Sequence, residues 1–256
     1  MPDQTPDRPR YLTEHLADLR KSFLRSVVIL AVGLVVAFWK SAWLFDVLLH
    51  PFKETLAKFP AVSGQVHTLQ TLAPIEAFMI NMKLAFVAGL IFASPFILRE
   101  IWAFMSQALK AQERSAILFV FCLGLFFFGG GVWFGYSVVI PLALDFLIRY
   151  NLDYQFIPQW TLQGYFGFVV NFLMLFGVIF ELPLVLMGFV AIGVATPAFL
   201  IHKWKHAIFG IFVLSAIVAP SADPITMTII ALPLVALYGV GIGLSWLASR
   251  RRNPVS

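Results

Sequence analysis

Long apolar runs constrain the fold of this chain more than any other feature. A hydrocarbon core about 30 Å thick needs roughly 20 apolar residues per crossing helix, whereas transmembrane strands alternate apolar and polar residues over about ten positions. The runs therefore predict an all-α membrane protein with six transmembrane helices. They fall near residues 22–39, 75–98, 116–140, 164–194, 207–219 and 225–248.

The composition supports this class. The 256 residues are 60% hydrophobic and 12% charged, whereas soluble domains carry roughly 25% charged residues. Six spans leave little chain for a second domain, so we expect one transmembrane domain over residues 1–256, with a basic tail at 249–256. No cleavage site of small residues follows the first run, and we expect no cleaved signal peptide. The single cysteine, Cys122, excludes an intrachain disulfide, and we expect no cofactor and no metal ion.

The positions of the basic residues predict the orientation. Of the 18 lysines and arginines, most lie in the N-terminal segment, the second and fourth connections and the C-terminal tail. Cytoplasmic segments accumulate basic residues, so we expect both termini in the cytoplasm and the chain in the cytoplasmic membrane. The same asymmetry accounts for the net charge of +5 without a nucleic-acid partner.

The outward connections and the last two helices have distinctive features. Residues 40–74 and 141–163 are long, contain prolines and aromatic residues, and predict a cap at the lipid interface. The fifth run has only enough residues to span about 20 Å, and Pro220 ends it. We therefore expect two short final helices that form an outward hairpin and thin the bilayer. The alternative is a longer fifth helix with a snorkelling polar start.

Glu181 is a carboxylate well inside an apolar run. An ionised carboxylate at the centre of a membrane helix costs roughly 2.5–3.5 kcal/mol on insertion scales, so such a group is protonated, paired or exposed to a wet cavity. Pro183 lies two residues on and predicts a kink beside it. Glu181 is therefore a candidate intramembrane polar site, and the alternative is a structural hydrogen bond to a neighbouring helix.

The acidic residues on the predicted cytoplasmic side form a second candidate site. Two carboxylates from different segments suit guanidinium groups, because each accepts two parallel N–H bonds from one arginine. Local i,i+3 pairing of Asp18 with Lys21 and of Glu113 with Lys110 is the alternative. Asp223 follows a turn, where a helix cap is its simpler role. The four acids on this side are Glu14, Asp18, Glu100 and Glu113.

Other functions have less support. The five histidines lie outside the apolar runs or at their ends, and an intramembrane hydrolase needs a nucleophile and a base within reach. We therefore expect a protein that is not an enzyme. A proton-coupled transporter of a small molecule that uses Glu181 is the remaining alternative, although it predicts an internal repeat that is not visible.

The ordered motifs of the chain resemble those of the TatC family, the multispanning subunit of the twin-arginine protein translocase. The resemblance covers five segments in the family's order. They are His15-Leu16-Ala17-Asp18-Leu19-Arg20; Pro95 to Phe104 followed by Leu109, Glu113 and Arg114; Gly131, Phe134, Tyr136, Pro141 and Phe146; Phe176, Gly177, Phe180, Glu181 and Pro183; and Pro220, Asp223, Pro233, Leu237 and Tyr238.

The resemblance implies a receptor that binds the paired arginines of folded-cargo signal peptides and nucleates a proton-gradient-driven export complex. It implies a glove-like concave bundle, with Glu181 facing the concave side. Single-span TatA/TatB-type subunits, further copies of the chain and membrane lipid are the implied partners. Asp18 and Glu113 match the family's signal-peptide-binding acids, with Arg20, Phe104 and Leu109 beside them. Pro51, Pro95 and Asp223 match structural or loop positions.

Overall fold

A computed structural model describes residues 12–60, 69–106, 116–156, 159–219 and 223–252. The described residues are almost entirely helical, and their one isolated β-bridge joins Gln70 to Thr161. The all-α class is confirmed. The elements are α1 (Leu12–Trp39), α2 (Ser41–Ala57), α4 (Glu76–Ser106), α5 (Ala116–Phe134), the π-helical turn η2 (Gly135–Val139), α6 (Ile140–Asp153), α7 (Leu162–Phe180), α8 (Leu182–Ala191), α9 (Pro197–His202), α10 (Trp204–Val218) and α11 (Pro224–Arg252).

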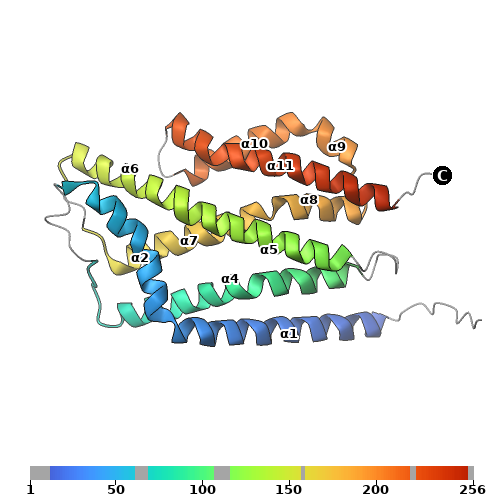
Figure 1. Cartoon of the computed structure of the whole chain (residues 1–256), viewed down its shortest axis with the longest axis horizontal. Coiled ribbons are helices and arrows are strands. Elements are labelled where there is room, and N and C mark those ends of the chain that lie inside the picture. Colours follow the sequence, from blue (N-terminus) through green and yellow to red (C-terminus); the bar gives the residue numbers. More distant parts are fainter. Residues whose placement is uncertain (1–11, 61–68, 107–115, 157–158, 220–222, 253–256) are drawn as a thin grey trace, which may run out of the picture.

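The long helices run back and forth along the long axis of the molecule (Figure 1). One end of the bundle, here called the terminus end, holds the start of α1, the end of α4, the start of α5 and the end of α11 (Figure 1). The other end, here called the loop end, holds α2, the end of α6 and the start of α7 (Figure 1). This arrangement agrees with an even number of crossings.

Among the described residues, five helical segments are long and apolar enough to cross a membrane, and Trp204–Val218 is a shorter apolar helix. With 15 residues, α10 is about 22 Å long, so the fifth helix is short as expected. The expectation of a short last helix is wrong, because α11 has 29 residues. Its buried residues Ile230, Leu234 and Leu237 belong to the same core cluster as α8. Pro233 lies within this packed part of α11, and the helix continues past it.

The predicted outward connections are helical over much of their length. The third span continues through η2 and α6 as one apolar segment, Cys122–Asp153. Pro141 does not end it, because it stands in the first turn of α6, where a missing N–H group is tolerated. The connection at 40–74 likewise contains α2, with Pro51 inside the helix.

The long fourth run is interrupted at Glu181, as the neighbouring Pro183 predicts. The residue ends α7 and begins α8. Its backbone carbonyl accepts hydrogen bonds from the N–H groups of Leu184 and Val185, both at 3.0 Å. The chain therefore remains hydrogen-bonded through the break, and the carboxyl group of Glu181 lies at a defined bend within the membrane-spanning segment.

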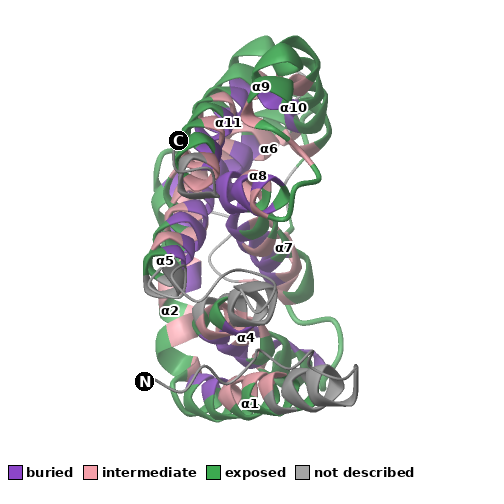
Figure 2. Cartoon of the chain, turned by 90° about the vertical axis from the view of Figure 1, so that its right-hand side faces the viewer, coloured by how far each residue is buried: buried purple, intermediate pink, exposed green. Residues whose placement is uncertain are grey.

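Two apolar clusters form the core. One joins α2, α4, α6 and α7 around Leu144, Phe166 and Val169. The other joins α5, α7, α8, α10 and α11 around Phe176 and Ile230. Helix α1 packs mainly along α4, and most of its surface is exposed or half-buried in the isolated chain (Figure 2). Its outer face is apolar and suited to contact with lipid.

Two glycines bring α5 and α7 close together. A Cβ atom at Gly131 would overlap the carbonyl oxygen of Phe176, and one at Gly177 would lie 2.9 Å from the ring of Phe128. By contrast, a Cβ atom at Gly129 would meet nothing within 4 Å. The crossing of α5 and α7 therefore depends on particular glycines rather than on the glycine-rich composition of α5.

Candidate functional site

The described candidates for arginine binding belong to helices at the terminus end. Asp18 is in the second turn of α1, and Phe104 is in the last turn of α4. Arg20, two residues after Asp18, is exposed. Glu113 and Leu109 lie outside the described residues. The structure brings the start of α1, the end of α4 and the start of α5 to one end of the bundle (Figure 1), and a shared site for Asp18 and Glu113 stays a prediction.

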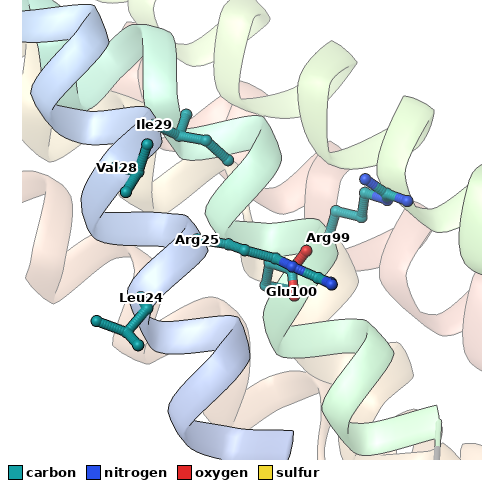
Figure 3. Close-up of a pocket in the computed structure, with 6 residues that line it drawn as sticks. All are labelled: Leu24, Arg25, Val28, Ile29, Arg99 and Glu100. Atoms are coloured by element: carbon teal, nitrogen blue, oxygen red, sulfur yellow. The ribbon is translucent and has the colours of Figure 1, made fainter.

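An open pocket of about 460 Å³ lies between α1 and α4 at this end. Figure 3 shows the Arg25 side chain extending from α1 toward Glu100 on α4, whereas Arg99 leaves α4 on the side away from α1. Glu100 is 9% exposed. The pocket thus combines two guanidinium groups, one carboxylate and an apolar wall. Its lining residues are Leu24, Arg25, Val28, Ile29, Arg99 and Glu100.

Glu181 is a buried carboxylate at membrane depth. The residue is 8% exposed, and neither carboxylate oxygen has a hydrogen-bond partner among the described residues. Helix α11 passes directly beside the break, because a Cβ atom at Gly241 would lie 3.0 Å from the Cα atom of Pro183. The structure therefore shows no hydrogen bond from a described residue that would support the structural alternative for Glu181.

Pro51 has a defined place at the loop end. A proline lacks the N–H group that would bond the carbonyl four residues earlier, here that of Val47. The hydroxyl of Tyr136 donates to this carbonyl at 2.7 Å, and the hydroxyl of Tyr165 donates to the next one, Leu48, at 2.6 Å. Two tyrosines thus attach the bent α2 to η2 and α7.

Glu76 ties the segment before α4 to the start of α7. Its Oε2 accepts hydrogen bonds from the N–H groups of Leu72 at 2.6 Å and Ala73 at 3.3 Å. Its Oε1 accepts one from the N–H of Gln163 at 2.8 Å. The backbone bridge between Gln70 and Thr161 lies beside this contact. The carboxylate therefore satisfies three backbone donors, two in the segment just before α4 and one at the start of α7.

Of the remaining loop and structural candidates, Asp223 directly precedes α11 and Pro95 lies within α4. Asp223 caps α11, since its Oδ2 accepts from the N–H of Thr226 at 2.7 Å and its Oδ1 accepts from the Thr226 hydroxyl at 2.8 Å. This is the simpler role that the sequence favoured. Pro95 falls inside α4, and Pro220 lies outside the described residues.

Sequence reasoning missed two features of this arrangement. It named Glu100 only as one of four acids on the predicted cytoplasmic side. It did not place Glu100 beside Arg25, because the two residues lie 75 positions apart on different helices. It also passed over Glu76, although an acid at the first position of a helix is a recognisable signal for bonds to free N–H groups.

The comparisons with known proteins agree with one another. The family model described as Sec-independent protein translocase protein (TatC) matches residues 14–233. A relative of that name from Deinococcus radiodurans is 38% identical over 240 residues, which cover 91% of this chain and 85% of the relative. One from Aquifex aeolicus is 34% identical over 245 residues, which cover 95% of this chain and 98% of the relative.

Two solved structures agree with the match to the TatC family model. A crystal structure of the twin arginine translocase receptor TatC superimposes with a TM-score of 0.71 and 34% sequence identity, covering 92% of this chain and 100% of that one. A second crystal structure of this receptor, in DDM, gives a TM-score of 0.72 over 90% of this chain and 99% of that one. The similarity thus extends over nearly the whole of both chains.

Proposed function

Because the chain belongs to the TatC family of Sec-independent protein translocase proteins, we propose that its terminus end binds the paired arginines of signal peptides. The chain is a multi-pass membrane protein, and its solved relatives are twin arginine translocase receptors. One observation carries the proposal: the start of α1, with Asp18, and the end of α4, with Phe104, meet at one end of the bundle (Figure 1).

The chemistry of the site rests on Asp18 and Glu113. A carboxylate accepts two parallel N–H bonds from one guanidinium group, whereas a lysine ammonium is a point charge without this fork. Two acids on separate segments therefore suit two consecutive arginines better than two lysines. In this proposal, Arg20, Phe104 and Leu109 contact the signal-peptide residues next to the arginines.

The terminus end faces the cytoplasm in this proposal. It carries Arg25 and Arg99 on described helices, Lys203 and Lys205 near the α9–α10 junction and the basic residues that end α11, as the positive-inside rule requires. A cysteine placed at Lys205 in a Cys122→Ser background should react with a membrane-impermeant maleimide only in inside-out vesicles. Labelling in intact cells would reverse the orientation.

Single-span TatA/TatB-type subunits dock along α10 in this proposal. The short helix shows an apolar stripe at i,i+4 spacing, with Phe209 72%, Val213 43% and Ile217 76% exposed. A helix of 15 residues is also shorter than the roughly 20 residues a bilayer core needs. Cysteine pairs between this stripe and a partner helix should form disulfides, whereas pairs with the outer face of α1 should not.

Glu181 supplies a polar group for the assembled complex, which exports folded proteins and is driven by the proton gradient. Its carboxyl group at the α7–α8 break has no hydrogen-bond partner among the described residues. This supports the role, since an intramembrane ionisable residue is a functional candidate by default. Replacement by Gln should keep the fold and reduce export. The comparisons give no support to the alternative of a small-molecule transporter.

Peptide binding tests the proposed site. A labelled peptide with an Arg-Arg signal and its Lys-Lys version are titrated against the purified full chain and against Asp18→Asn and Glu113→Gln. Each lost charge-assisted bond should weaken Arg-Arg binding by about 1.5–3 kcal/mol, or roughly tenfold or more. Glu54→Gln in α2, an acid at the loop end, is the matched control and should leave binding unchanged. Equal affinity for both peptides would contradict the proposal.

A further inference from the structure

The pocket between α1 and α4 has the composition of a lipid headgroup site. We propose that it binds one phospholipid, with the phosphate on Arg25, the headgroup donors on Glu100 and an acyl chain along Leu24, Val28 and Ile29. The inference concerns a ligand other than the signal peptide and does not depend on the arginine-binding site proposed above.

The pocket lies near the ends of the apolar windows of α1 and α4, where a membrane interface is expected. The apolar window of α1 begins at Ser22, and that of α4 ends at Ser94. Arg25 is therefore about 4.5 Å inside one boundary, and Arg99 about 7.5 Å beyond the other, at 1.5 Å per residue. Long arginine side chains reach outward from such positions to the interface. The guanidinium group of Arg25, which extends toward α4 (Figure 3), can thus meet a phosphate there, whichever leaflet it belongs to.

The charges favour a phosphate over a cationic peptide. Two of the three ionisable side chains that line the pocket are guanidinium groups, which match phosphate geometry with paired N–H donors. Basic pockets between membrane helices are typical sites for lipid headgroups. A twin-arginine peptide would instead add two positive charges to a site that already has two.

The apolar wall favours a lipid over a free phosphate ester. Leu24 is 51% and Val28 60% exposed beside the pocket, and both lie on α1, as Arg25 does (Figure 3). An acyl chain laid along this surface removes apolar area from the polar interface, which a soluble headgroup cannot do. The volume of about 460 Å³ accommodates a headgroup and the first part of one chain.

Glu100 gives the site a headgroup preference. Its side chain is largely buried, and no hydrogen bond or ion pair joins it to another residue in the described part of the chain. A carboxylate accepts hydrogen bonds and donates none. It therefore favours ethanolamine, with its N–H donors, and glycerol, with its O–H donors, over choline, which has neither.

Native mass spectrometry of the full chain tests the proposal by counting retained lipids. Dioleoyl phosphatidylethanolamine, phosphatidylglycerol and phosphatidylcholine are added separately at equal concentration. The wild-type chain should retain one molecule of either of the first two about tenfold more than phosphatidylcholine. Soluble glycerophosphate at the same concentration should not displace them. Displacement by glycerophosphate, or equal retention of all three lipids, would overturn the proposal.

The variants separate the two contacts. Arg25→Gln should reduce the retention of all three lipids about fivefold, whereas Glu100→Gln should remove only the preference over phosphatidylcholine. Val28→Trp fills the groove without changing charge and should also reduce retention. Lys205→Gln, a charge loss elsewhere at the terminus end, is the matched control and should change nothing. If Arg25→Gln spares lipid retention but changes twin-arginine peptide affinity, the pocket belongs to the peptide and the lipid proposal is wrong.

Discussion

The two ends of the molecule use polar groups in opposite ways. At the loop end, Glu76 accepts three backbone hydrogen bonds, and the hydroxyls of Tyr136 and Tyr165 reach carbonyls beside Pro51. At the terminus end, Arg25, Arg99 and Glu100 line an open pocket and form no ion pair with one another in the described structure. The loop end is thus fastened by satisfied groups, and the terminus end offers charges to ligands.

This difference shows how a membrane protein separates stability from binding. A polar group that is satisfied inside the chain contributes to the fold and has little left for a ligand. A charge at the interface without an internal partner costs little while water reaches it, and it can then bind an incoming group. We therefore expect substitutions in the scaffold to lower stability and substitutions at the terminus end to change binding.

The crossing of α5 and α7 should give the largest effect on stability. Gly131→Ala places a methyl group on the backbone of Phe176, so the two helices must separate. We expect a loss of about 3 kcal/mol of unfolding free energy, measured by denaturation of the purified protein in detergent. Gly129→Ala, where a methyl group meets nothing within 4 Å, is the matched control. Equal stability of the two variants would show that the close crossing of α5 and α7 does not stabilise the fold.

The hydroxyl of Tyr165 should give the next largest effect. Tyr165→Phe keeps the packing of a ring that is 2% exposed but leaves the carbonyl of Leu48 without its donor. The loss of one hydrogen bond costs about 0.5–1.5 kcal/mol. The exposed Tyr154 provides the control, and Tyr154→Phe should change the midpoint of unfolding little. An unchanged midpoint for Tyr165→Phe would show that α2 is not held by this bond.

Pro51 and Tyr136 should be coupled by about 1 kcal/mol. In the Pro51→Ala variant, the new N–H group can bond the carbonyl of Val47, so the hydroxyl of Tyr136 is needed less. Tyr136→Phe should therefore destabilise the Pro51→Ala background less than it destabilises the natural sequence. A double-mutant cycle measures this difference directly. Additive effects would mean that the tyrosine does not compensate for the missing donor of the proline.

The smallest effect on stability should be at the terminus end. Arg25 is exposed, so Arg25→Gln should change the unfolding free energy by less than about 0.5 kcal/mol while it changes ligand retention. Thermal unfolding and lipid counting on the same preparation check both expectations. A stability loss as large as that of Tyr165→Phe would show that Arg25 belongs to the scaffold, and the contrast between the two ends would fail.

The sequence predicted the features that depend on apolar runs and on single residues such as proline. Apolar runs located the membrane helices, and the short fifth run located α10. Pro183 predicted the break at Glu181, which the structure shows between α7 and α8. These features are local, because each follows from how neighbouring residues satisfy or interrupt a helix.

Contacts between distant segments could not be predicted from the sequence. The apolar run that was expected to end at residue 140 continues as a helix, because Pro141 stands in the first turn of α6, directly after η2. The hydroxyl of Tyr165 meets Leu48, 117 positions away, and no spacing rule indicates such a pair. Asp18 and Glu113 came from the family resemblance, since charge patterning alone allowed local pairing with nearby lysines.

The position of a bound signal peptide tests the central claim most directly. A twin-arginine peptide with a photoreactive group beside its arginines is bound to the purified full chain, irradiated and mapped by mass spectrometry. The account predicts adducts at the terminus end, in the first turns of α1 and the last turns of α4, and fewer adducts with the Lys-Lys peptide. Adducts on α2 or α6 at the loop end, at equal yield for both peptides, would contradict it.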